Sequence, residues 1–567
     1  MKRRVIAILT MGMLLALTAC TGLPTSGPVN PGLGPDQNSD ARPYNFVPDP
    51  PPSGASPEQI VSGFLGAGSG PQDDWARARL YLTPDFAEEW DPLAGVTIDR
   101  SADRSAPTSA VSASPTPDPA STVVVTQRVT AQAFVSATGE YTPADGNATP
   151  LEFRLVQSDG QWRIEDARDG IVLSQDVFDT VYQPANVMFF DPTWRYLVPD
   201  VRWFPRPLIA TRVTQALIDG SPSEWLTGAV VNAFPENVSL VGNAVPLSGS
   251  AAEVELSTTA FDLEQVTLDR MQTQLEESLA SIDVTSVELT VGSTPLDAER
   301  TAAVSNPSVY RLPLVELADG QVGFLGADSV ERIPGLSDAL EDSRAVSIAV
   351  DPAWSSAAVL TDTGAVVRAR SNGTIEALDV TTPSLLPPSI DRDGAVWTAA
   401  RDDPDTFTVY PAGGEPVVIT APWASATTLL SFQISREGSR IAALVTANGR
   451  TELWVAGIQR EDDRPSGVGD PELVTTSSST GIAVAWLNDV DLGALVTSGD
   501  AVALLRQPIG GRGTSTALAS NVVDIAGGNS TVRLRTAEGA LLIERGATWE
   551  ESAKGISLLA IQQGQPQ

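Results

Sequence analysis

The run Ser347-Ile348-Ala349-Val350-Asp351, followed after a turn by Ala357-Ala358-Val359-Leu360, decides the fold of the C-terminal half of this chain. Both segments are short and apolar, and polar turn-forming residues lie between them, which is typical of two paired buried strands. The pattern returns at intervals of about 40 to 50 residues. Its other copies are Pro388-Ser389-Ile390-Asp391, Ser431-Phe432-Gln433-Ile434-Ser435, Ile482-Ala483-Val484-Ala485-Trp486 and Asn521-Val522-Val523-Asp524-Ile525-Ala526.

A repeat of this length, with several short strands in each copy, predicts the blades of a β-propeller over residues 306–567. One blade cannot bury both of its faces, so the blades must stack radially. Five copies are visible, and residues 309–315 together with 556–561 can form a sixth, in which the C-terminal strand closes the ring. We therefore expect five to six blades. Residues 389–397 resemble the Asp-box hairpin of many propellers, with one extra residue, and that hairpin is usually structural.

Residues 183–305 predict an α+β domain. Strands are expected at 187–190, 253–257 and 287–291, and helices at 208–218, ending at Gly220, and at 262–280; a capping box at 221–224 predicts a further helix start. The pattern resembles the GerMN module of exported Gram-positive proteins. Arg202 and Arg212 are candidates for binding an anionic group of the cell wall. The alternative is that both are solvated surface side chains.

Residues 55–182 predict a smaller α+β domain. Ser56-Pro57-Glu58-Gln59 combines an N-cap, a proline at the first helical position and a capping-box glutamine, so a helix begins there. Strands are expected at 122–136, 151–157 and 161–165, and the Ser/Ala/Pro-rich segment 101–121 is expected to be a disordered insertion. Helices followed by a curved antiparallel sheet resemble the cone-shaped nuclear-transport-factor-2-like (NTF2-like) fold. That fold can hold a ligand, but the sequence does not select one.

The N-terminus predicts export. Three cations at positions 2–4 precede an apolar run that ends at Leu17-Thr18-Ala19-Cys20, which makes residues 1–19 a signal peptide that is too short to span a membrane comfortably. The last four residues resemble the bacterial lipobox. That resemblance implies cleavage between Ala19 and Cys20 and acylation of Cys20 with S-diacylglycerol and an N-acyl group such as palmitate. The alternative is an ordinary signal peptide with an accidental Cys. Residues 20–54, rich in Pro and Gly, predict an extended tether.

Composition excludes several kinds of chemistry. The chain has no His, a single Cys and only two lysines, Lys2 and Lys554, so His-dependent triads, His-ligated zinc and disulfides are excluded. The net charge of −34 argues against nucleic acid and against electrostatic adhesion to anionic lipid. The acidic clusters at 402–405 and 461–463 lack the alternation of a calcium loop and are expected to be solvated. We expect no cofactor, no metal and no enzymatic activity.

The order of these parts, a multidomain α+β region followed by an all-β region, resembles the actinobacterial lipoprotein LpqB family. The resemblance rests on the Cys20 lipobox, on 160–166 continuing through 169–173, and on 197–204. It implies an accessory protein of the MtrAB two-component system that associates with the extracytoplasmic part of the sensor kinase MtrB, at the outer face of the cell membrane, and influences cell-wall homeostasis and division. The rival hypothesis is an envelope lipoprotein that binds the wall or cleaves it with paired propeller carboxylates.

Overall fold

The computed structural model describes residues 47–566, except 112–121 and the single positions Asp145, Asp328, Pro422, Ala424, Asp500, Ser520, Ser530 and Ala547. The described residues belong to one compact unit, Val47–Gln567. No helix within them is long and apolar enough to cross a membrane.

The N-terminal domain begins with the predicted capping box. The Ser56 side chain accepts a hydrogen bond from the Gln59 backbone N–H, and the Gln59 side chain accepts one from the Ser56 N–H. Helix α2 (Pro57–Ala67) follows and buries Ile60, Val61 and Phe64 among its apolar residues. Two short helices come next, α3 (Ala76–Arg79) and α4 (Pro84–Glu89).

The sheet of this domain is built on one long strand. Its elements are β1 (Gly95–Asp99), β2 (Thr108–Val111), β3 (Val123–Ser136), β4 (Tyr141–Pro143), β5 (Ala148–Ser158), β6 (Gln161–Asp166) and β7 (Ile171–Ser174). The order is β6-β5-β3-β1-β7, with β2 and β4 also paired to β3, and all pairs are antiparallel except β1 with β7. Burial alternates along the 14 residues of β3, so one face of the strand lines the core. The strands predicted at 122–136, 151–157 and 161–165 are confirmed.

The expectation of disorder over 101–121 is wrong for its first part. Residues Ser101–Asp103 form a 3₁₀ turn, and β2 pairs with the N-terminal half of β3. The Ser/Ala/Pro-rich composition did not indicate a strand, because β2 is held by backbone hydrogen bonds to β3. Pairing of this kind needs no particular side chains on the added strand. Residues 112–121 lie outside the described part of the chain.

The second domain contains two sheets. Helix α5 (Gln175–Val181) leads into the antiparallel pair β8 (Tyr182–Phe190) and β9 (Leu197–Pro205). The other sheet has the order β10-β11-β12-β13, and α7 connects its parallel central strands β11 and β12. The remaining bounds are α6 (Ile209–Asp219), η4 (Glu224–Leu226), β10 (Leu247–Ser248), β11 (Ala251–Glu255), η5 (Thr258–Asp262), α7 (Gln265–Ala280), β12 (Ser286–Val291) and β13 (Thr294–Pro295).

Two helix ends in this domain test the sequence prediction. Helix α6 ends as predicted at Gly220, whose φ of 81° is the left-handed conformation that glycine adopts most easily. The helix predicted to start at the 221–224 capping box is wrong, since only the 3₁₀ turn η4 forms there. The Ser223 side chain does not cap it, because its hydroxyl donates to Asp200 instead.

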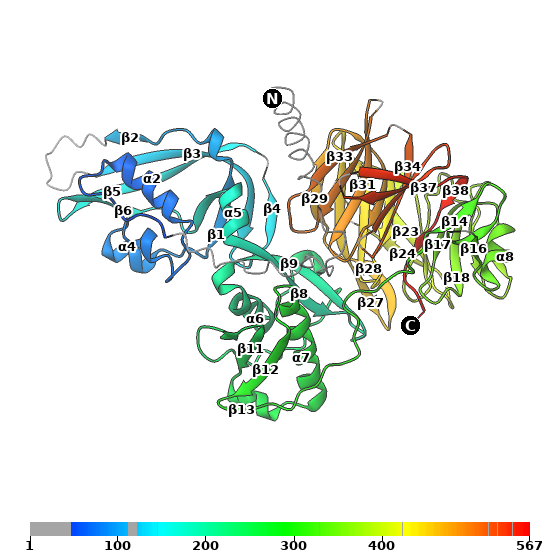
Figure 1. The fold of residues 1–567 in the computed structure, drawn as a ribbon, viewed down its shortest axis with the longest axis horizontal. Helices are drawn as coiled ribbons and strands as arrows, with labels where there is room; N and C mark the ends of the chain where they lie inside the picture. Colours follow the sequence, from blue (N-terminus) through cyan, green and yellow to red (C-terminus); the bar gives the residue numbers. More distant parts are fainter. Residues whose placement is uncertain are drawn as a thin grey trace, which may run out of the picture. The chain divides into compact units, whose positions relative to one another are not determined.

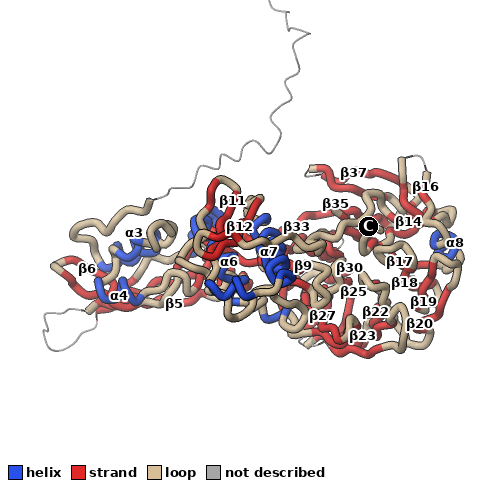
Figure 2. The backbone as a smooth tube through the Cα atoms, turned by 90° about the horizontal axis from the view of Figure 1, so that it is seen from below, coloured by secondary structure: helices blue, strands red, loops and turns tan. Residues whose placement is uncertain are grey.

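The C-terminal domain is a propeller of six sheets within the described residues. Figure 2 shows it as strands joined by loops, with α8 (Leu336–Glu341) as its described helix. The strands are β14 (Leu314–Leu317), β15 (Val322–Leu325), β16 (Val330–Glu331), β17 (Ala345–Val350), β18 (Ser356–Thr361), β19 (Val366–Arg370), β20 (Ile375–Asp379), β21 (Ser389–Ile390), β22 (Val396–Ala400), β23 (Asp403–Tyr410), β24 (Val417–Thr420), β25 (Ala426–Ile434), β26 (Arg440–Ala447), β27 (Arg450–Glu461), β28 (Arg464–Val468), β29 (Glu472–Ser477), β30 (Thr480–Trp486), β31 (Asp491–Ser498), β32 (Ala501–Pro508), β33 (Thr514–Leu518), β34 (Val522–Gly528), β35 (Thr531–Thr536), β36 (Leu541–Arg545), β37 (Thr548–Ala553), β38 (Ile556–Leu559) and β39 (Ile561–Gln562).

The last two strands of this domain join its first two sheets. Strand β38 pairs antiparallel with β14, placing Leu559 opposite Val315, and β39 pairs in parallel with β17. In Figure 1 the red C-terminal strands lie beside the green strands β14 and β17. The predicted closure of a sixth blade by residues 309–315 and 556–561 is therefore confirmed.

Removal of the closing strands tests this arrangement. A chain that ends at Gly555 loses the buried side chains of Ile556, Leu558 and Leu559, and we expect the free energy of unfolding to fall by at least about 4 kcal/mol. Urea unfolding followed by tryptophan fluorescence measures it. A control chain that lacks only 565–567 should unfold at the native midpoint, and equal midpoints for both truncations would contradict closure by β38.

Candidate functional site

The predicted acylation site, Cys20, and the predicted cleavage position after Ala19 lie outside the described residues. Both stay predictions from the sequence, as does the part of the tether that precedes residue 47.

Arg202 does not lie on the surface, contrary to both interpretations of it. Its side chain is 3% exposed and forms an ion pair with Asp200 at 2.8 Å. The guanidinium also donates to the Ser221 carbonyl at 2.7 Å, and Asp200 accepts hydrogen bonds from the backbone and the hydroxyl of Ser223. A buried arginine whose charge is already matched has little capacity left for a wall anion. Arg202 and Asp200 together hold the 221–223 turn against β9.

Arg212 is half-buried on α6 and is also engaged. Its guanidinium donates to the Ala137 carbonyl at 2.8 Å, which joins the second domain to the N-terminal one. The same group lies 5.8 Å from the centroid of the Phe204 ring, within the range of a cation–π contact. Arg212 therefore serves the packing between domains.

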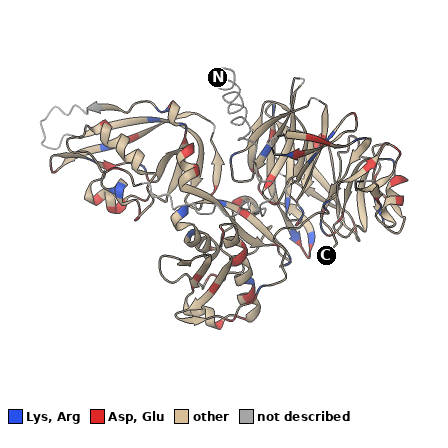
Figure 3. Ribbon diagram, in the orientation of Figure 1, with Lys and Arg blue, Asp and Glu red and all other residues tan. Residues whose placement is uncertain are grey.

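The acidic clusters lie where solvent reaches them. Asp402, Asp403 and Asp405 are exposed just before and at the start of β23, and Glu461 to Asp463 are exposed at the end of β27 and in the turn that follows it. Within the described residues no group of three or more Asp, Glu, His or Cys side chains is placed to hold a metal ion. Figure 3 shows Asp and Glu spread over all parts of the described ribbon.

The buried carboxylates of the propeller organise its repeated turns. Asp351 accepts hydrogen bonds from the backbone of Ser355 and Ser356, and Asp391 accepts them from Asp393 and Ala395. These are turns that follow the first strand of their blades, at two of the positions where the sequence repeat ends. The acidic residues of the repeat thus satisfy backbone donors that a turn would otherwise leave buried and unpaired.

A buried network of charges joins the second domain to the propeller. Asp191, at the end of β8, and Arg392, in the turn between β21 and β22, form an ion pair at 2.5 Å with side chains 0% and 1% exposed. Arg392 also donates to the Glu437 carbonyl and stacks on the Tyr196 ring, 4.5 Å from its centroid. Beside them Arg460 binds Asp391 at 3.0 Å. The network draws together one loop of the second domain and three segments of the propeller.

Asp191 is held in its charged form. Burial alone would raise the pKa of its carboxyl, but the Arg392 charge and hydrogen bonds from Thr193 and Tyr196 outweigh burial and lower the pKa below its ordinary value. Removing either partner would leave the other charge buried and uncompensated, which is the costly way to break such a pair.

An apolar core continues across the same junction. Phe189, Phe190, Trp225 and Leu226 of the second domain belong to one cluster with propeller residues that include Trp486. At Gly457, on β27, a Cβ atom would lie 2.6 Å from that of Ala229 and 2.9 Å from the Trp225 carbonyl oxygen. Only glycine lets the η4 turn approach the strand this closely. The two domains therefore share a core and do not merely touch.

A cavity of about 840 Å³ lies in the N-terminal domain, where the resemblance to the NTF2-like fold allowed a ligand pocket without indicating its lining. Residues of α2, β1, β3, β5, the turn 168–170 and the start of β7 line it. That turn is held close to β1, because a Cβ on Gly170, with φ of 87°, would lie 2.5 Å from the Gly95 carbonyl oxygen. The dipeptide Asp169-Gly170 indicates a turn in the sequence, but hydrophobic periodicity does not indicate where a cavity lies between strands.

Comparison with known proteins agrees with this architecture. Residues 50–179 match the family model described as "Lipoprotein LpqB, N-terminal domain", and residues 320–558 match "Lipoprotein LpqB beta-propeller domain". Lipoprotein LpqB of Cutibacterium acnes is 26% identical over 98% of this chain and 98% of its own length. Lipoprotein LpqB of Nocardia farcinica is 28% identical over 84% of this chain and 83% of its own. The chain belongs to the LpqB lipoprotein family.

LpqB relatives are named as lipoproteins with a propeller domain and not as an enzyme family, which is consistent with a membrane-anchored protein of the cell envelope. Among solved structures, "Crystal structure of Nidogen/Laminin Complex" has a TM-score of 0.33 at 9% identity over 44% of this chain and 97% of that chain. "Structure of Dos1 propeller" has a TM-score of 0.27 at 9% identity over 35% of this chain and 56% of that chain.

The Asp191–Arg392 ion pair predicts a change in stability that depends on pH. Asp191→Asn leaves Arg392 buried beside a neutral amide, so the free energy of unfolding at pH 7 should fall by about 3 kcal/mol. Because the pKa of Asp191 is lower in the folded chain than in the unfolded one, its charged carboxylate stabilises the fold at pH values above the ordinary carboxyl pKa. This stabilisation is lost as the pH falls through the folded-state pKa. The difference between the native chain and the variant should therefore shrink below about pH 4.

Urea unfolding at pH 7 and pH 3.5 measures both effects. Asp462→Asn, at an exposed turn position, is the matched control and should change stability by no more than about 0.5 kcal/mol. A difference for Asp191→Asn that stays constant with pH would show that its carboxylate is not stabilised by Arg392.

Proposed function

We propose that this LpqB-family chain is a lipoprotein anchored through acylated Cys20 to the extracytoplasmic face of the cell membrane. There it acts as an accessory partner of the MtrAB two-component system. It binds the extracytoplasmic domain of the sensor kinase MtrB and biases its signalling, and through it cell-wall homeostasis and division. It is not an enzyme in this proposal.

The shared core and buried charges of the second domain and the propeller carry this proposal. An accessory protein shifts a kinase between two states only if it binds those states with different affinity. A rigid pair of domains discriminates between the two kinase states better than two hinged domains would, because a hinge lets the domains adjust to either state of the kinase. The junction supports a body of this kind.

The lipid anchor supplies the second part of the argument. Two or three acyl chains hold a protein on a bilayer stably, whereas one chain binds reversibly. A kinase in the same membrane then meets the lipoprotein at a high effective concentration, so even a weak contact is occupied. The acidic composition leaves this attachment to the lipid, since a net charge of −34 does not favour anionic headgroups.

The wall-cleaving alternative receives less support. Its paired carboxylates would need to be free to hold or donate a proton to substrate. Asp351 and Asp391 are instead committed to turn hydrogen bonds, and Glu437 is buried against Arg440 at 2.7 Å. Wall binding without cleavage keeps the same localisation as the main proposal.

Crosslinking in cells followed by mass spectrometry tests the proposal. We expect MtrB to be enriched with the native chain and lost with Cys20→Ala, because that variant is no longer held beside the kinase. Thr21→Ala, which leaves the lipobox cysteine in place, is the matched control and should behave as the native chain. Enrichment of wall glycans or wall-synthesis enzymes in place of the kinase would contradict the adaptor role and favour the envelope-binding alternative.

A further inference from the structure

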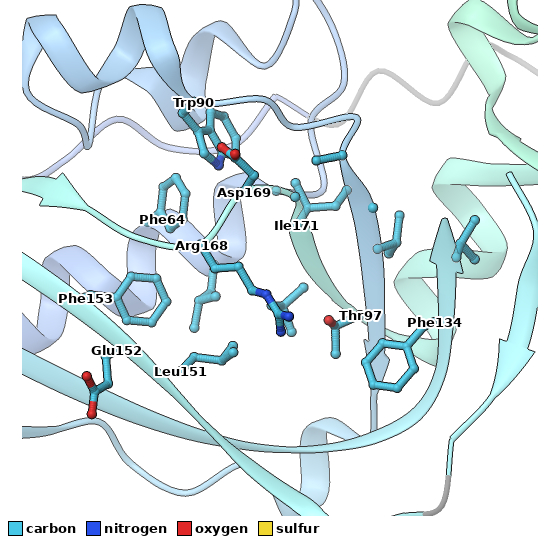
Figure 4. A pocket seen from close by; sticks show the side chains of 18 of the residues that line it. Phe64, Trp90, Thr97, Phe134, Leu151, Glu152, Phe153, Arg168, Asp169 and Ile171 are labelled. Carbon is cyan, nitrogen blue, oxygen red and sulfur yellow. The ribbon is translucent and has the colours of Figure 1, made fainter. Parts of the chain in front are cut away.

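The cavity of the N-terminal domain has a rigid apolar wall. Phe64 packs edge-on against Trp90, with ring centroids 5.2 Å apart, and against Phe153 at 6.1 Å. Trp90 is 2% exposed, and the Arg79 guanidinium lies 5.4 Å from the centroid of its ring. Figure 4 shows these rings along one side of the space. The aromatic wall is therefore fixed by contacts within the domain, and its position does not depend on a bound ligand.

The opposite side is formed across three neighbouring strands. Thr97 on β1 lies opposite Phe134 on β3 and opposite Val172 on β7, so the three side chains stand in one row across the sheet. All three line the cavity, and Phe134 remains 43% exposed. An aromatic ring left this open beside a cavity is a site where apolar surface can be removed from water by a ligand.

One cation faces this space. In Figure 4 the Arg168 side chain extends into the cavity between Leu151 and Thr97. Among the described residues its guanidinium has no hydrogen bond and no ion pair, although carboxylates are in large excess in this chain. Arg168 is solvent-exposed, so its guanidinium stands at the open side of the cavity, where its unpaired donors can meet the acidic head of a ligand whose chain lies inside.

The two acidic residues of the lining do not neutralise it. The Asp169 carboxylate accepts a hydrogen bond from the Asp91 backbone N–H at 3.0 Å, at the far end of the turn. The Glu152 side chain points away from the centre of the cavity in Figure 4. A ligand therefore meets an aromatic wall, the row of Thr97, Phe134 and Val172, and a single guanidinium.

We propose that this cavity binds an acidic amphiphile, a single apolar chain that carries one carboxylate or phosphate. The chain lies along Phe64, Phe153 and Phe134, and the acidic head accepts hydrogen bonds from Arg168. The volume is within the range of pockets for small molecules. A polyhydroxylated ligand such as a wall glycan fits worse, because the apolar lining would leave its hydroxyls unpaired. This inference does not rest on the partnership with the kinase.

Probes with one chain and different heads test the proposal. The protein is the mature chain with Cys20→Ala, so that no attached acyl group competes. Isothermal titration is made with dodecyl phosphate and laurate, with dodecyltrimethylammonium and dodecanol, and with inorganic phosphate alone. We expect the two acidic probes to bind one site at least about 10-fold more tightly than the cationic and neutral ones, as charge-assisted hydrogen bonds to a guanidinium imply. Inorganic phosphate, which has no apolar chain, should not bind.

Two pairs of variants locate the site. Arg168→Glu should weaken dodecyl phosphate at least about 10-fold, whereas Arg77→Glu, at an exposed arginine of the same domain, should not. Val172→Trp fills the cavity and should abolish binding, whereas Leu80→Trp, at an exposed leucine of the same domain that does not line the cavity, should not. Thermal unfolding of each variant shows whether the domain is folded.

The outcomes separate the sources of the ligand. Binding of dodecyl phosphate that Val172→Trp removes from a folded chain supports a cavity for free amphiphiles. Equal affinity for the cationic probe, or binding that survives Val172→Trp, overturns the proposal. Binding only to phosphatidylglycerol vesicles, with no binding of free dodecyl phosphate, also overturns it, because the domain would then contact a membrane surface and not enclose a chain.

Discussion

The pairing of the last propeller strand with the first is the contact on which the rest of the structure depends. Each blade exposes apolar side chains on both faces, and stacking covers them only when the ring has no open end. Here β38 and β14 complete one sheet from residues about 240 positions apart, and Ser557 donates across the seam to the Glu316 carbonyl. The turns that carry Asp351, Asp391 and Arg392 take their positions from this closed ring.

The junction of the second domain with the propeller combines two kinds of interaction with different consequences. The apolar cluster around Trp225 and Trp486 supplies most of the attraction, because it removes area from water without requiring a fixed register. The Asp191–Arg392 pair contributes less net free energy, since both charges lose their hydration. It is satisfied in one geometry only, with Thr193, Tyr196 and Glu437 supplying or accepting the remaining hydrogen bonds. The pair thus selects a single placement of one domain on the other.

The N-terminal domain follows a different principle, in which a single strand pairs with two strands along each of its halves. The first half of β3 pairs with β2 and β5, and its second half pairs with β1 and β4. The sheet therefore turns from one set of neighbours to another, and the space beside β1 and β5 is closed by α2, the 168–170 turn and the start of β7. A pocket formed in this way is lined by residues from the whole length of the domain.

Local patterns determined much of this protein. The apolar runs and their spacing determined the propeller and its closure, the capping box determined the start of α2, and Gly220 determined the end of α6, because each acts through neighbours in sequence or through a repeated unit. The lipobox at Cys20 is likewise a local signal. Only the tertiary structure decided that Arg202 is buried beside Asp200, that Asp191 meets Arg392 about 200 residues away, and that Arg168 faces an apolar cavity. Burial and charge pairing depend on which distant segments pack together. The sequence alone therefore does not show whether an arginine faces water, an acidic partner or an apolar cavity.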